Sequence, residues 1–245
     1  MAGLFLVNCL DVARFFGQQP FNATAREVFE RIEDMYLGPS GGGFNHDPVI
    51  AATYDVFRGA ASAKNAIEYC RSNGNPKGRD QNTAIARVVA PYAASNVSRC
   101  YSIGFTAIVV GRYRGRSIHV GIKAPFFRVA GGRGRLVIPG YRKDSRPVGR
   151  EIGLACSFAS NQLARDDFET AEVEYLMAGP GRSATERRLQ VLLGGELDLY
   201  SADQLDVLLQ TYVDAVVMHL ERGAGLNAPR LHGYRIIDPA QPRMI

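Results

Sequence analysis

Residues 101–110 read YSIGFTAIVV, and here the spacing of apolar residues changes from a helical to a strand-like period. Apolar side chains occupy alternate positions, as in a β-strand with one buried face. These positions are Tyr101, Ile103, Phe105, Ala107 and Val109. Ile108 and Val110 add apolar side chains on the second face, so we expect the far end of the strand to be buried on both faces.

The segment before this strand predicts helices, because its apolar residues recur at three- and four-residue spacing. Asn22 or Thr24 can cap the first helix, and Asp47, followed by proline, can cap the second. Pro91 is expected to kink or end the last helix early. The expected helices span residues 24–36, 47–57, 62–70 and 82–94.

After residue 110 the alternation continues in short runs separated by turns. Arg114 and Gly115 can turn the chain, and the glycines of residues 131–134 can form the tip of a second hairpin. We expect one continuous meander. Residues 183–186 also fit a capping box for a short helix, but the alternation after them favours a strand. The expected strands span residues 101–110, 118–122, 126–129, 136–138, 170–177 and 187–193.

The strongest helical pattern lies near the C-terminus, from Ser201 to Glu221. Ser201 and Gln204 form a capping box, a wide apolar stripe follows, and Gly223 is a typical stop. Helices and strands segregate along the chain instead of alternating. The pattern therefore predicts an α+β fold, with a helical N-terminal part packed against a mainly antiparallel β-sheet and a long C-terminal amphipathic helix.

Length and composition are typical of one globular domain. The 245 residues are 46% hydrophobic and 22% charged, outside the disordered and membrane classes. No apolar run approaches the roughly 20 residues that cross a bilayer, and the N-terminal apolar stretch lacks the basic region of a signal peptide. We expect a single domain over residues 1–245, in which residues 1–97 are mainly helical, residues 98–222 form a sheet and the final helix, and residues 223–245 form an extended tail.

The cysteines carry no recognisable metal or redox motif. Cys9, Cys70, Cys100 and Cys156 lie far apart, without a C-x-x-C pair. This spacing argues against a zinc site and fits a reducing compartment, in which each cysteine is a small buried hydrophobic residue. The sequence therefore predicts a cytoplasmic protein with no membrane association.

Positive charge is concentrated in the predicted meander. Between Arg112 and Arg150, eleven basic residues accompany one acidic residue, Asp144, so this segment carries +10. The whole chain carries +5, which leaves −5 for everything outside the segment. A basic face on an otherwise acidic body predicts binding of a polyanion, with DNA or RNA as the leading partners.

The leading functional hypothesis is a nucleic-acid-binding protein whose arginine-rich meander grips the phosphate backbone. Aromatic residues between the arginines could stack on unpaired bases. These aromatic residues are Tyr113, Phe126, Phe127 and Tyr141. The residues expected to bind phosphates are Arg112, Arg114, Arg116, Arg133, Arg135, Arg142 and Lys143. Outward-facing, solvated arginines would give the same pattern.

An enzyme is the second hypothesis. Glu172 and Glu174 lie two residues apart in an expected strand, so both carboxylates would project from one face. Three further acids precede them: Asp166, Asp167 and Glu169. Such a group could hold Mg²⁺ in a metal-dependent nuclease or phosphohydrolase, although solvated strand residues explain it as well. No other cofactor is expected, and the binding hypothesis needs none.

His46 is a further catalytic candidate, as a general base oriented by Asp47. The competing interpretation is that Asp47 caps a helix, and the other histidines are isolated in the sequence. A third hypothesis is a protein-interaction or self-assembling subunit, in which the basic face meets an acidic partner or another copy of the chain.

Overall fold

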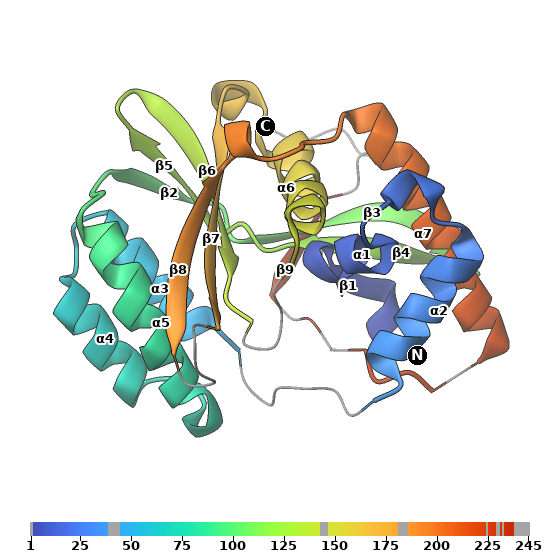
Figure 1. Ribbon diagram of the computed structural model, residues 1–245, viewed down its shortest axis with the longest axis horizontal. Coiled ribbons are helices and arrows are strands. Elements are labelled where there is room, and N and C mark those ends of the chain that lie inside the picture. Colours follow the sequence, from blue (N-terminus) through green and yellow to red (C-terminus); the bar gives the residue numbers. More distant parts are fainter. Residues whose placement is uncertain are drawn as a thin grey trace.

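The chain folds into two mixed β-sheets flanked by helices, which confirms the α+β class (Figure 1). The computed structural model describes residues 2–38, 45–142, 147–180, 186–223, 225–228, 231 and 233–237. Seven α-helices occur within these residues: α1 (Cys9–Phe16), α2 (Ala25–Tyr36), α3 (Asp47–Phe57), α4 (Ala63–Ser72), α5 (Pro76–Ala94), α6 (Gly149–Leu163) and α7 (Ala202–Arg222).

The first sheet joins segments from both ends of the chain. Its strands, in spatial order, are β1 (Leu6–Asn8), β4 (Arg116–Ile122), β3 (Phe105–Tyr113) and β9 (Tyr234–Ile237). Strands β3 and β4 form an antiparallel hairpin, while β1 and β9 add to its two edges in parallel. Each parallel pair joins segments that are far apart in the sequence. No turn between the two strands of such a pair indicates that they are neighbours.

The second sheet has the order β2 (Arg99–Ser102), β5 (Phe126–Ala130), β6 (Arg133–Gly140), β7 (Glu172–Pro180) and β8 (Arg187–Leu193). All pairs are antiparallel except β6 with β7. The strand β8 confirms the choice of a strand over a short helix at this position.

The prediction of one continuous meander is wrong. The expected strand 101–110 breaks at Gly104, whose φ is +72°, so β2 joins the second sheet and β3 the first. The amides of Ile103 and Gly104 both donate to the carbonyl of Pro125, at 2.9 and 3.1 Å. The point at which the chain enters the first sheet therefore lies next to the point at which the chain leaves that sheet.

Two apolar cores lie on opposite faces of the second sheet. Helices α3, α4 and α5 cover one face and bury Phe126, Val137 and Leu176. On the other side lie α6, α1 and the first sheet, against which α7 packs (Figure 1). The second sheet thus separates the helical segment 47–94 from the rest of the described chain.

The helices show where sequence patterns succeed. Helix α7 has the predicted capping box between Ser201 and Gln204 and ends at Gly223 in a left-handed conformation. Helix α5 starts at Pro76, earlier than expected, and continues through Pro91 to Ala94. Helix α6 was not expected, because residues 152–159 are buried on every side and show no amphipathic stripe.

A buried ion pair joins the second sheet to its covering helices. Arg128 of β5 donates through Nε and Nη2 to the two carboxylate oxygens of Glu174 on β7, at 2.6 and 3.0 Å. Both side chains are 0% exposed. The hydroxyl of Tyr92 on α5 donates to the same carboxylate at 2.5 Å, and the guanidinium lies 4.9 Å from the ring centre of Phe57 on α3.

The carboxylate keeps Arg128 charged in the core. Burial alone would lower the pKa of Arg128, but the hydrogen bonds and attraction from Glu174 outweigh burial and raise that pKa.

Glu174→Gln should destabilise the protein strongly, because it leaves the Arg128 charge buried without a carboxylate. We expect a loss of about 3–5 kcal/mol of unfolding free energy, measured by urea denaturation with circular dichroism. Replacing both partners, as Arg128→Met with Glu174→Leu, should recover most of the loss.

The matched control is Glu30→Gln, which breaks the exposed Arg26–Glu30 pair on α2 and should change stability little. A Glu174→Gln protein as stable as the wild type would contradict this role for the buried pair.

Candidate functional site

The β3–β4 hairpin presents three of the predicted phosphate-binding residues at its tip, which we call the arginine hairpin (residues 112–116). Arg114 and Gly115 form a two-residue turn in which both residues have positive φ, +46° and +78°. A turn of this kind matches the twist of the paired strands and makes a tight tip. Arg112, Arg114 and Arg116 are all exposed.

Two residues of the arginine hairpin, Arg114 and Arg116, contact aromatic rings. Arg114 lies 5.1 Å from the ring centre of Tyr113, and Arg116 lies 3.8 Å from that of Phe5. Neither Arg114 nor Arg116 makes an ion pair with any described residue. The aromatic contacts orient the guanidinium groups without neutralising them.

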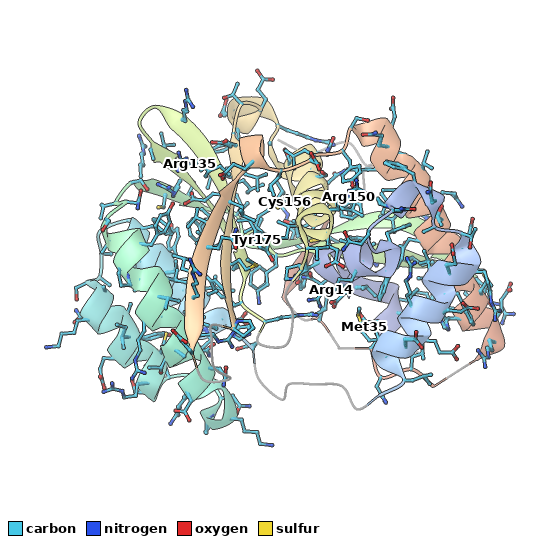
Figure 2. The ribbon with its side chains drawn as sticks, viewed as in Figure 1. Arg14, Met35, Arg135, Arg150, Cys156 and Tyr175 are labelled. Atoms are coloured by element: carbon cyan, nitrogen blue, oxygen red, sulfur yellow. The ribbon has the colours of Figure 1, made fainter. Side chains whose placement is uncertain are left out.

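A second basic tip lies on the β5–β6 hairpin. Arg133 is exposed at the tip, whereas Arg135 is half-buried, with its Nε atom enclosed and unpartnered among the described residues. Figure 2 shows Arg135 close to this hairpin, and Figure 1 shows the two hairpins extending toward opposite ends of the molecule. Five of the six predicted arginines therefore form two groups instead of one face, and Arg142 belongs to neither group.

Other members of the basic segment have acidic partners. Arg142 donates to both carboxylate oxygens of Asp11, with one distance of 2.8 Å, and Lys123 donates to Asp47 at 3.3 Å. Arg128 is held by Glu174 as described above. The count of basic residues thus overstates the charge available to a ligand. Lys143 lies outside the described residues.

The aromatic residues expected to stack on bases do not form an exposed set. Phe126 and Phe127 are 2% exposed and Tyr141 is 4% exposed, because each belongs to an apolar core. Tyr113 is half-buried and lies against Arg114. The expectation of base stacking by Phe126, Phe127 and Tyr141 is therefore wrong.

The surroundings of Glu172 and Glu174 do not favour the enzyme hypothesis. Glu172 and Glu174 do project from one face, but that face packs under α3–α5. Glu174 is held by Arg128 and Tyr92, and Glu172 accepts a hydrogen bond from the amide of Gly195 at 3.3 Å. Among the described residues, no group of three or more His, Cys, Asp or Glu side chains is placed to hold a metal ion.

His46 lies immediately before α3, as its N-cap residue, while Asp47 is the first helical residue. Its Nδ1 atom lies 2.9 Å from the side-chain oxygen of Asn82, and Asp47 bonds instead to Lys123 and Asn45. An amide oxygen only accepts, so Nδ1 carries the proton. Burial, together with the cations Lys123 and Arg187, lowers the pKa of His46 to about 4.

Two further histidines make hydrogen bonds to the backbone of distant segments. His119 and His219 each bond to a backbone carbonyl, of Phe5 and Phe29 respectively. His232 lies outside the described residues. Cys9, Cys70 and Cys156 are buried as predicted, whereas Cys100 is half-buried. Within the described residues, no helix has the length and apolar character needed to cross a bilayer.

The buried position of Arg187 could not be predicted from the sequence. Arg187, 7% exposed, donates to the carbonyls of Tyr141 and Ala178 and to the side chain of Gln81. Its neighbours come from three separate segments, so no local pattern could reveal them.

A scan against protein-family models and a search of curated proteins found no match.

The protein should lose stability through His46 as the pH falls. The folded pKa of about 4 lies below the ordinary value of 6.5, so between these values the unfolded chain binds a proton that the folded chain does not. Unfolding free energy should therefore fall by up to about 1.4 kcal/mol per pH unit in this window.

Urea denaturation from pH 8 to pH 4 measures this slope for the wild type and for His46→Gln. The variant should show a shallower slope below pH 6.5, with the difference between the two proteins constant above pH 7. Parallel curves over the whole range would show that His46 titrates normally in the fold.

Proposed function

We propose that this protein binds nucleic acid through the arginine hairpin, by contacts to the phosphate backbone. The observation that carries the proposal is the presence of three exposed arginines among the five residues of a tight hairpin tip. Two of them, Arg114 and Arg116, make no ion pair with the described chain.

Guanidinium groups suit this role because they stay charged and bind phosphate oxygens through paired N–H donors. Each phosphate contact releases condensed counterions, which gives the binding its characteristic salt dependence. With the core aromatic residues buried, the proposal rests on backbone contacts and requires no base stacking. The Arg133 tip contributes separately, because the two hairpins extend in opposite directions (Figure 1).

The double variant Arg114→Gln with Arg116→Gln should weaken binding and reduce its salt dependence. Fluorescence anisotropy with labelled single- and double-stranded DNA and RNA, over a salt series, measures both quantities. If both arginines contact phosphates, the slope of log affinity against log salt should become shallower by about 2.

The control is Arg71→Gln with Arg26→Gln, which removes the same charge from exposed residues of α4 and α2 that already pair with glutamates. This control should retain most of the affinity and the original slope. Equal losses in both double variants would reduce the effect to net charge. Absence of binding at low salt would overturn the proposal and favour a protein partner.

A further inference from the structure

A cavity of about 130 Å³ opens between the two sheets, and we call it the inter-sheet cleft. It lies where β1 and β4 of the first sheet and β6 of the second reach their C-terminal ends, next to the first turns of α1 and α3. Ligand sites commonly occupy such crevices outside the carboxyl ends of strands. The polar residues that matter here are Asn8, Lys123, Arg142, Tyr175 and Tyr234.

Tyr175 supplies a buried hydroxyl without a partner. It is 1% exposed, lines the inter-sheet cleft, and its hydroxyl finds no hydrogen-bond partner among the described residues. Figure 2 shows it near the centre of the molecule, beside Cys156 of α6. A β-carbon at Gly140 would collide with this hydroxyl, so glycine is required for it to lie there. Phenylalanine would fill the same space without the cost of an unpaired hydroxyl.

The charged groups around the cleft favour an anion. Lys123 and Arg142 both line it, and their partners Asp47 and Asp11 are shared with other donors. Asp11, which also accepts from Arg14 at 3.5 Å, and Asp47 do not line the cleft, and no carboxylate is found among the described residues that do. The first turns of α1 and α3 add partial positive charge from their unpaired amides.

Asn8 and Tyr234 form a hydrogen-bonded pair on the wall of the cleft. The side-chain amide of Asn8 donates to the hydroxyl of Tyr234 at 3.4 Å, while its oxygen caps α1 through the amide of Leu10. The Tyr234 hydroxyl proton is therefore free to point toward a further acceptor.

We propose that the inter-sheet cleft binds a small oxyanion, either a carboxylate or a phosphate group, through the Tyr175 hydroxyl, the Lys123 ammonium and the Arg142 guanidinium. The volume corresponds to roughly four water molecules, which admits one such group and little more. A larger ligand would place its anionic end in the cleft and extend outward. This site is independent of the arginine hairpin.

Isothermal titration calorimetry with inorganic phosphate and with acetate, at constant ionic strength, tests the proposal. The wild type should bind at least one of them saturably, and the preferred anion distinguishes a phosphate from a carboxylate site. Tyr175→Phe should bind about tenfold more weakly, as expected for loss of one hydrogen bond to a charged group. Its stability without ligand should equal or exceed that of the wild type.

Lys123→Gln should weaken binding as well, whereas Tyr69→Phe, at an exposed position of α4, should leave it unchanged. The hairpin variant Arg114→Gln with Arg116→Gln should bind the anion normally, and Tyr175→Phe should bind nucleic acid normally, so each proposal can fail alone. No saturable binding of either anion, or equal affinity in Tyr175→Phe and the wild type, would overturn the oxyanion site.

Discussion

The ion pair between Arg128 and Glu174 is the interaction on which the arrangement of this protein depends. It crosses β6 to connect β5 with β7, and through Tyr92 and Phe57 it reaches the helices that cover the second sheet. A charge buried at this depth is tolerated only with a matched and hydrogen-bonded partner. The pair therefore adds a polar connection between the second sheet and α5 and α3, beside the apolar core that these elements share.

Ion pairs within the chain, such as this one, also reduce the number of basic residues that are available to a ligand. The basic segment is an excess in the sequence, yet three of its members serve internal contacts: Arg128 with Glu174, Arg142 with Asp11, and Lys123 with Asp47. Among the described residues, Arg112, Arg114, Arg116 and Arg133 are exposed at or beside hairpin tips. Pairing within the chain thus separates two kinds of basic residue, those that contact acidic side chains of the same chain and those that extend into solvent.

The sequence predicted elements whose pattern is local. Helices α2 and α7 were recognisable from a cap and an apolar stripe, and β8 from alternation. Helix α6 was not predicted, because it is buried on all sides. The break at Gly104 was not predicted either, because the strand pattern continues across it. Both cases depend on contacts with distant segments of the chain, which a local period does not record.

The candidate sites follow the same division. The arginine hairpin was predictable, because its residues are neighbours in the sequence and a turn signal places them at a tip. The inter-sheet cleft was not, because Asn8, Lys123, Arg142 and Tyr175 come from four separate segments. Tyr175 in particular reads as an ordinary apolar strand residue until the structure shows its hydroxyl unpartnered among the described residues.

The position of α7 also restricts how a nucleic acid could reach the arginine hairpin. A β-carbon at Gly111 would lie 2.7 Å from Val213, so β3 approaches this helix closely. The outer surface of α7 is acidic, with exposed Asp203, Asp206, Asp214 and Glu221. Phosphates are repelled from that surface and attracted to the tip, so the nucleic acid should approach the hairpin end-on. If the proposed binding occurs, the acidic surface of α7 and the basic tip would orient the nucleic acid before contact as well as hold it afterwards.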